Sequence, residues 1–202
     1  MVREKILQMA SEILPRYGIK SVTMDDLAQR LSISKKTIYQ HFKDKSTLVE
    51  AVVDELFLMQ DQQIATIHEK RADAIEEMYL ISVFIRQLCS SMDASVVYDL
   101  KKYYPKAFDK LQCHKEEKMK CSISDNLKEG VKQGFYRKEI NVEILAKLKM
   151  MEAEWSFDPE KFPPEKHKMV EVKLELFHHF LYGVLTTHGL QMLNIYKEKY
   201  KQ

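Results

Sequence analysis

SISKKTIYQHF, residues 32–42, places polar and basic side chains around two large apolar ones, Ile38 and Phe42. In a helix, successive side chains rotate by about 100°, so Ile38 and Phe42 would share one face. Lys36 and Gln40 would then point the opposite way. We therefore expect the apolar pair to dock this helix on its neighbours, while the polar side chains face a flat, negatively charged partner.

Two helices are predicted before this segment, because apolar residues recur at three- and four-residue spacings. The first covers roughly residues 2–17 and ends at Gly18, and Pro15 should bend or tighten its last turn. Its inward stripe is Ile6, Ala10, Ile13, Leu14 and Tyr17. The second begins at Thr23, which can form a capping box with Asp26. Its inward positions are Leu27, Ala28 and Leu31.

A three-residue link, Ser32 to Ser34, joins the second helix to the opening segment, and Ser34 is a natural N-cap. Two helices joined by a tight turn, the second with a polar and basic outer face, match a helix-turn-helix, whose second helix enters the DNA major groove. A short amphipathic helix is often only a solvated surface helix. Spacing alone leaves both interpretations open.

The whole chain of 202 residues is predicted to be all-α, with nine or ten helices, because it has only 5 glycines and 5 prolines and lacks alternating β-branched runs. The first three helices would form a small N-terminal head, and the others a larger helical body. The long helices are predicted at residues 44–68, 105–133, 141–155 and 165–188, with Asp44, Pro105 and Asn141 at starts and Gly134 and Gly189 at ends.

Charge and cysteine usage constrain the compartment and partners only weakly. The net charge is +2, and residues 1–50 carry nine Lys or Arg against six acidic residues. Cys89, Cys113 and Cys121 form an odd set without a C-x-x-C pair, which favours a reducing compartment. The charged, amphipathic start differs from a signal peptide, and no apolar run approaches the ~20 residues that span a bilayer. We expect a soluble cytoplasmic protein with no membrane partner.

The stretch ILQMASEILPRYGIKSVTMDDLAQRLSISKKTIYQHFKDKSTLVEAVV closely resembles the N-terminal DNA-binding domain of the TetR family. The shared features are Tyr17-Gly18-Ile19, Thr23, Leu27-Ala28 and the specific motif T-x-Y-x-H-F-x-x-K, formed by Thr37, Tyr39, His41, Phe42 and Lys45. The resemblance covers about residues 5–53. It implies a helix-turn-helix DNA-binding domain at residues 1–48 and a helical effector-binding and dimerisation domain at residues 49–202.

The resemblance also assigns roles to single residues. The expected phosphate contacts come from Thr23, Tyr39, His41 and Lys45. The expected base contacts come from Lys35, Lys36 and Thr37, while Gln40 can read adenine or only touch the backbone. Phosphate contacts would set register and affinity, and base contacts would set sequence preference.

The family resemblance further implies a ligand-responsive regulator, most often a repressor, that binds a double-stranded palindromic operator as a homodimer. The dimer is expected to use the last two long helices, with Leu174, Phe177, Phe180, Leu181, Gly183, Val184 and Leu185 at the interface. Gly183 suggests a close helix crossing. The alternative is that this helix is an internal core helix of a monomer.

An unidentified small molecule is expected to act as effector by favouring one spacing of the two DNA-binding heads, with the fourth helix as the lever. Plausible pocket residues are Met78, Phe84, Met92, Tyr98, Phe108, Met119 and Trp155. Aromatic residues and methionines at helical spacing are more often core residues than ligand contacts. No charged group identifies a ligand class.

A competing interpretation is a helical-bundle metal protein or enzyme centred on Glu175 and His178. The Glu175-x-x-His178 spacing is half of a carboxylate di-iron site, but the sequence has no second E-x-x-H. Cys113 and Cys121 lack the short spacing of a zinc site, and a redox role for them is weakly supported. We expect no enzyme activity, no cofactor and no metal. A third interpretation is an interaction protein whose head no longer binds DNA.

Overall fold

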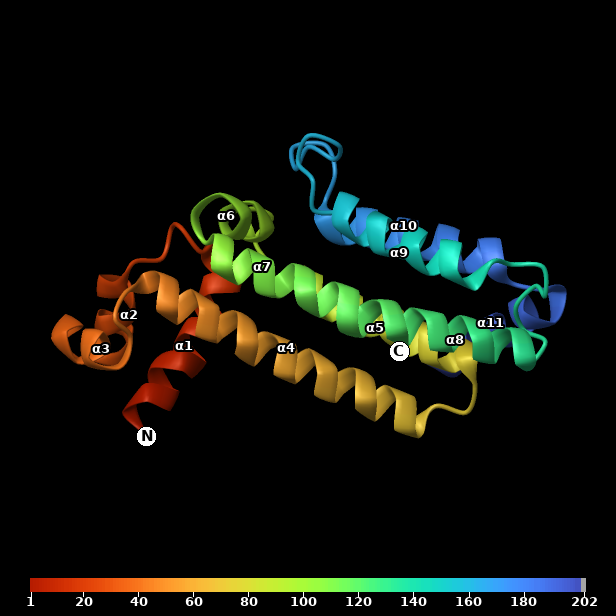
Figure 1. Ribbon diagram of the computed structural model, residues 1–202, viewed down its shortest axis with the longest axis horizontal. Coiled ribbons are helices and arrows are strands. Elements are labelled where there is room, and N and C mark those ends of the chain that lie inside the picture. The colour runs from red at the N-terminus through yellow and green to blue at the C-terminus, as the bar shows by residue number, and fades with distance from the viewer. Residues whose placement is uncertain (201–202) are drawn as a thin grey trace. The chain divides into compact units, whose positions relative to one another are not determined.

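The computed structural model describes residues 1–200, which form helices joined by turns and loops, as predicted (Figure 1). The helices are α1 (Val2–Tyr17), α2 (Met24–Leu31), α3 (Lys35–His41), α4 (Lys45–Lys70), α5 (Ala74–Ser90), α6 (Val96–Tyr103), α7 (Pro105–His114), the π-helical turn η1 (Lys115–Met119), α8 (Lys120–Lys132), α9 (Val142–Trp155), α10 (Met169–Val184) and α11 (Thr187–Lys199). Counting α7, η1 and α8 as one continuous run gives ten helices among these residues, which agrees with the predicted nine or ten. Within residues 1–200, no helix combines the length and apolar character needed to cross a membrane.

The chain divides into two compact units. The first unit contains Met1–Asp61 and Ser91–His114, and the second contains Gln62–Ser90 and the residues from Lys115 on. Two helical runs, α4 and α7–η1–α8, contribute residues to both units. The first unit therefore includes α6 and α7 as well as the head, and the functional boundary near residue 48 stays a prediction.

The head forms through the local signals expected from the sequence. Thr23 and Asp26 make the capping box, with the Asp26 backbone N–H donating to Thr23 Oγ1 at 3.1 Å. Ser32 ends α2 in the left-handed conformation with φ of 53°, and Ser34 Oγ accepts the Thr37 backbone N–H at 3.0 Å. These caps fix the three-residue turn, and α1, α2 and α3 pack against one another (Figure 1).

The core of the first unit is the predicted apolar stripe, with one correction. Ile6, Leu14, Leu27, Ile38 and Phe42 are all at most 1% exposed. Tyr17 was expected on the same inward stripe, but it is 46% exposed. Its ring lies beside the guanidinium groups of Arg16 and Arg30, each 5.4 Å from the ring centroid. Tyr17 is the last residue of α1, where a surface position lets it pair with these cations.

Three of the four predicted long helices start where the sequence predicts. Asp44 Oδ1 accepts the Thr47 backbone N–H at 2.7 Å, and Asn141 Oδ1 accepts that of Ile144 at 3.1 Å. Gly134, with φ of 75°, follows the continuous run from Pro105. The π-helical turn inside that run was not predicted.

The predicted ends of the last long helix, residues 165–188, are wrong. Helix α10 covers only Met169–Val184, and a separate helix, α11, follows a break at Leu185 and Thr186. Thr186 caps α11 by accepting the Gly189 backbone N–H at 3.0 Å, so Gly189 begins a helix and does not end one. The Thr186 backbone N–H donates to the Phe135 carbonyl at 2.9 Å. This pairing with the segment after α8 interrupts the helix.

A buried polar network organises the second unit around the loop before α5. The Arg71 Nε–H donates to Glu77 Oε2 at 2.7 Å, and Asn126 donates to the same oxygen at 2.7 Å. The Tyr196 hydroxyl donates to Asp73 Oδ2 at 2.6 Å. Because each buried carboxylate has partners, the network joins α5 to α8 and α11 without leaving a bare buried charge.

Candidate nucleic-acid interface

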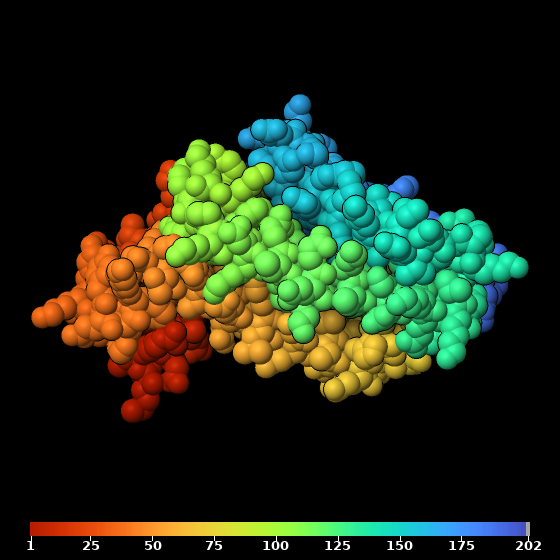
Figure 2. Space-filling model, in the orientation of Figure 1, coloured from red at the N-terminus to blue at the C-terminus, as the bar shows by residue number. Residues whose placement is uncertain are grey.

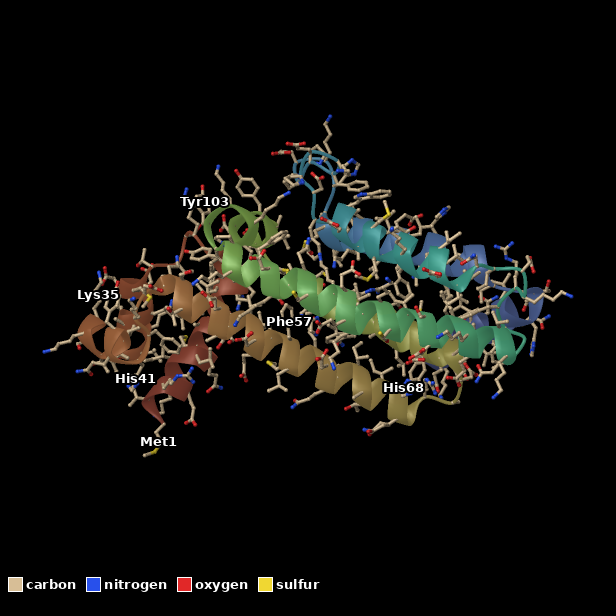
Figure 3. All side chains as sticks on the ribbon, viewed as in Figure 1. Met1, Lys35, His41, Phe57, His68 and Tyr103 are labelled. Atoms are coloured by element: carbon tan, nitrogen blue, oxygen red, sulfur yellow. The ribbon has the colours of Figure 1, made fainter. Side chains whose placement is uncertain are left out.

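The outer face of α3 carries the polar side chains that the sequence singled out. Lys35, Lys36, Tyr39, Gln40 and His41 are all exposed, while Ile38 on the same helix is fully buried. Lys35 and His41 lie at the surface of the head in Figure 3. A short helix thus presents donors, a phenol and cations on one side and its anchor on the other, which suits the DNA major groove and its phosphates.

Besides Lys45, three of the eight predicted DNA-contacting residues also have partners inside the head. Lys35 Nζ donates to Asp25 Oδ2 at 2.7 Å, in an exposed ion pair between α3 and α2. The half-buried Thr37 pairs its hydroxyl with Ser34 Oγ at 2.8 Å, and the Thr23 hydroxyl donates to Asp26 Oδ2 at 2.7 Å. These contacts pre-order the start of each helix. Lys36, Tyr39, Gln40 and His41 keep exposed side chains for an external partner.

Lys45, at the first position of α4, has a structural role that its motif position did not predict. Its ammonium donates to the carbonyls of Ile19 and Lys20, the latter at 3.3 Å. Burial lowers the pKa of Lys45, and the charge of Asp99 opposes that shift. A lysine held this way supplies a positive charge at the base of the head and also ties α4 to the turn after α1.

Helix α6 is attached to the same turn, a connection that the sequence analysis missed. The buried Asp99 accepts the Lys20 backbone N–H through Oδ2 at 2.8 Å. The Asp93 backbone N–H donates to the Pro15 carbonyl at 2.7 Å. Gly18, with φ of 86°, sits between these contacts, and a Cβ there would lie 3.1 Å from Ser95 Oγ. The end of α1 is therefore held from both α4 and α6.

The part of α4 in the first unit is braced by α7. The rings of Phe57 and His114 stack with centroids 4.1 Å apart, and His114 Nε2 lies 2.8 Å from Asp61 Oδ1. Lys110 Nζ donates to Asp54 Oδ2 at 2.6 Å. These contacts recur along the helix and join α4 to α7 over this stretch.

The seven predicted pocket residues do not form one group. Met92, Tyr98 and Phe108 belong to the first unit, and Met78, Phe84, Met119 and Trp155 to the second. Tyr98 is 44% exposed and Trp155 is 37% exposed, which corrects their assignment to an enclosed pocket. Met78 is a core residue of the second unit, and Met92 and Phe108 pack at the edge of the core of the first. The effector-pocket role of the other five residues stays a prediction.

The predicted dimer interface also needs correction. Phe177, Phe180, Leu181, Val184 and Leu185 belong to the core of the second unit. Side chains that are buried inside one protomer cannot contact a partner chain. Leu174 is half-buried, and Gly183 is exposed, with no neighbouring atom within 4 Å of the place where an added Cβ would lie. Most of this face of α10 thus packs in the core of its own protomer.

Helix α9 instead exposes an apolar stripe. Ile144, Leu148, Met151 and Trp155 are between 37% and 64% exposed and are spaced by four, three and four residues. This alternation of three and four places all four side chains along one line of the helix. Figure 1 shows α9 beside α10, whose exposed residues include Tyr182.

The metal-protein interpretation finds no set of ligands in the described part of the chain. Residues 1–200 contain no group of three or more His, Cys, Asp or Glu side chains arranged to hold a metal. Burial lowers the pKa of His178, and the nearby Lys197 lowers it further, against the opposing charge of Glu175. Cys113 and Cys121 are exposed free thiols, and Cys89 is a buried one.

A docked, basic helix after a three-residue turn defines this head as a DNA-binding helix-turn-helix domain. The sequence profile of bacterial regulatory proteins of the tetR family matches residues 6–52. The head of this chain is therefore similar to the DNA-binding domain of TetR-family transcriptional regulators.

Relatives over most of the chain are regulators as well. The chain is 26% identical to the uncharacterized HTH-type transcriptional regulator YvaF of Bacillus subtilis, over 82% of this chain and 85% of YvaF. It is 24% identical to the HTH-type transcriptional repressor KstR2 of Mycolicibacterium smegmatis, over 71% of each chain. A TetR-family regulator from Agrobacterium tumefaciens has the same fold, with a TM-score of 0.73 at 17% identity over 91% of this chain and 97% of that one.

Proposed function

We propose that this protein is a repressor that binds a palindromic operator as a homodimer and leaves it when a small molecule binds. The observation that carries the proposal is the exposed set on α3, Lys36, Tyr39, Gln40 and His41, above a buried Ile38. The relative KstR2 is named a transcriptional repressor, which supports repression over activation. A regulatory role, with no catalysis, fits the named relatives.

The homodimer is proposed to form through the exposed stripe of α9, Ile144, Leu148, Met151 and Trp155. Large apolar side chains aligned along one helix are costly to leave in water and are typical of an interaction surface. A second copy would present the same stripe, as two-fold symmetry requires. The exposed Tyr182 and Gly183 on α10 lie on a neighbouring helix and would extend the surface.

Effector control is proposed to act through the turn that follows α1. Lys45 of α4 and Asp99 of α6 both hold the backbone of Lys20 in this turn. An effector that prefers one position of α4 and α6 would therefore favour one spacing of the two heads. Operator release then follows from a population shift, because only one spacing reaches both half-sites.

The direct test is selection of bound sites from a random pool of double-stranded DNA at near-physiological salt. We expect recovery of an inverted repeat, and a steep fall in affinity as salt rises. Recovery of single, unpaired half-sites would contradict the dimer, and absence of any enrichment by ligand-free protein would contradict DNA binding. Metal analysis of the same preparation tests the Glu175 and His178 alternative, which stoichiometric iron, manganese or zinc would revive.

Lys36 and Lys45 of the head are expected to affect DNA binding in different ways when each is replaced by alanine. Lys45→Ala should weaken binding to all sequences and lower the slope of log affinity against log salt by about 1, because it removes a phosphate contact. Lys36→Ala should relax the preference at one base step and cost about 1–3 kcal/mol there. The measurement is operator and random-DNA affinity across a salt series.

Lys138→Ala serves as the matched control, because Lys138 is an exposed lysine of the second unit. Thermal unfolding of Lys45→Ala should accompany the binding assay, since Lys45 also holds the Ile19 and Lys20 carbonyls. If the two head variants lose affinity in the same way on every sequence, the proposed division between phosphate and base contacts is wrong.

A further inference from the structure

Three lysines from different elements come together in the second unit. Lys115 is the first residue of η1, Lys149 lies on α9 and Lys173 on α10. Lys115 and Lys149 are only 7% and 8% exposed. The positive charges of Lys115 and Lys149 both act on Lys173. Lysine is among the residues least often buried, so two buried lysines beside the half-buried Lys173 require a physical reason.

The cluster has fewer negative charges than positive ones. Lys149 Nζ pairs with the buried Glu152 at 3.1 Å. Lys115 and Lys173 have no hydrogen-bonded or ion-paired partner among residues 1–200, and Lys115 is attracted only at longer range by the exposed Glu154. Among residues 1–200, the only ion pair between this cluster and a buried carboxylate is therefore that of Lys149 with Glu152. An additional anion would balance the charge that the protein leaves unpaired.

Aromatic rings surround two of these amines. Lys173 Nζ lies 3.7 Å from the centroid of the Phe157 ring. Lys149 Nζ lies 4.8 Å from the Phe177 ring centroid and 5.1 Å from that of Phe180. Ring faces attract a cation but do not neutralise it. Phe177 and Phe180 belong to the core, whereas the half-buried Phe157 forms an apolar wall beside Lys173, which suits a ligand with both an anionic and an apolar part.

Burial lowers the pKa of all three lysines. The pKa of Lys173 falls to about 8, through burial and repulsion by Lys115 and Lys149, with Cys89 opposing the shift. Glu154 and Glu152 oppose the lowering at Lys115 and Lys149, respectively. At neutral pH Lys173 is thus still mostly charged, at a cost to stability. Buried charges that cost stability are often kept because function needs them.

The backbone conformation at Lys115 also indicates a functional site. Lys115 opens η1, the only π-helical turn among residues 1–200, and such turns inside α-helices are frequent at functional sites. Phe157 belongs to the segment between α9 and α10, which projects from the surface of the second unit in Figure 2. The cluster therefore combines an irregular helical turn, a buried charge excess and a nearby surface loop.

We propose that Lys115, Lys149 and Lys173 bind the anionic group, a carboxylate or a phosphate, of a partly apolar effector whose apolar part contacts Phe157. The inference rests on the proposed function for its regulatory meaning, because it names the class of effector. The binding site itself does not depend on DNA binding.

The first test is thermal unfolding of the full-length protein without DNA, in the presence of octanoate, octanol, octylamine or inorganic phosphate. Octanoate should raise the Tm by at least about 5 °C at saturation, and octanol and octylamine, which match it in length, should raise it far less. Phosphate separates the sources of the anionic group: a shift with phosphate alone indicates a phosphate site, and a shift only with octanoate indicates a carboxylate site with an apolar part.

The second test compares Lys173→Met with Lys132→Met, which removes an exposed lysine of α8. Lys173→Met should raise the Tm of the ligand-free protein, since methionine is also unbranched, only one heavy atom shorter, and carries no charge. It should also abolish the shift caused by the anion. The control should change neither value. A lysine with a purely structural role would give the opposite pattern, with a lower Tm and an unchanged response to anions.

The anion response should also depend on pH. Lys173 loses its charge as the pH rises through about 8, so the stabilisation by octanoate should fall above that pH. Without ligand, the stability of the protein should instead increase with pH. Folding lowers the pKa of Lys173, so the folded state gains stability as the pH rises from about 8 towards the ordinary value of 10.5. Lys115, Lys149, Glu152, Glu154 and Cys89 are the other titratable groups around Lys173, and Lys173→Met isolates its contribution.

Operator release is measured separately, by adding octanoate to the protein bound to its selected DNA. Operator binding with no anion response in either assay would overturn the anion site and leave the proposed repressor intact. An equal Tm shift in the wild type and in Lys173→Met would also overturn the site. A saturable, Lys173-dependent Tm shift in a protein that binds no operator would keep the anion site and refute the proposed function.

Discussion

Gly130→Ala is expected to destabilise the protein by about 3 kcal/mol, which lowers the Tm by roughly 6–12 °C. A Cβ at residue 130 would lie 2.1 Å and 2.2 Å from two ring atoms of Tyr136. That ring cannot move aside easily, because its hydroxyl donates to Asn126 Oδ1 at 2.9 Å and its backbone N–H to the Gly130 carbonyl at 3.0 Å. Tyr136 is 1% exposed, so the clash falls in the core of the second unit.

The control is Gly183→Ala, because Gly183 is also helical but nothing lies within 4 Å of its added Cβ. This change should be neutral or should stabilise the protein by up to about 1 kcal/mol. Urea unfolding of both variants measures the difference. In a Tyr136→Ala background the cost of Gly130→Ala should disappear. A cost that persists without the tyrosine ring would refute the steric explanation.

Met151→Glu is expected to prevent dimer formation and to reduce operator affinity by on the order of 100-fold or more. Met151 is 41% exposed in the middle of the α9 stripe, between Leu148 and Trp155. In the proposed dimer two copies of this side chain approach each other around the two-fold axis, so glutamate would bury two like charges without partners. A protein with one head engaged at a time loses the gain in affinity from binding both half-sites.

Met59→Glu is the matched control, because it makes the same change at a methionine that is 56% exposed on α4. Analytical ultracentrifugation should give a dimer for the wild type and for Met59→Glu, and a monomer for Met151→Glu. Gel-shift titration with the selected operator then measures the loss of affinity. A dimer that survives Met151→Glu would move the interface away from α9.

Much of the head was predictable because its signals are local. The Thr23 and Asp26 box, the Ser34 cap and the inward pair Ile38 and Phe42 each depend on residues a few positions apart. The exposed polar face of α3 follows directly from that pairing. The motif identified Lys45 as a functional residue but did not reveal its hydrogen bonds, because its partners, the Ile19 and Lys20 carbonyls, are distant in sequence.

The body was less predictable because several of its helices are apolar on more than one face. The pattern of α10 does not tell which stripe faces the protomer's own core, and the predicted interface residues Phe177, Phe180 and Leu181 lie in that core. The break at Leu185 arises from the hydrogen bond between Thr186 and Phe135, 51 residues apart. Such long-range pairing has no signature in a local window.

By itself, then, the sequence determined an all-α chain with a helix-turn-helix head, because caps and helical periodicity act between near neighbours. Only the tertiary structure decided which apolar faces meet each other and which remain exposed, as on α9. It alone also brought Lys115, Lys149 and Lys173 together. Burial and electrostatic interaction depend on distance in space, and residues far apart in the chain become neighbours only when the helices pack.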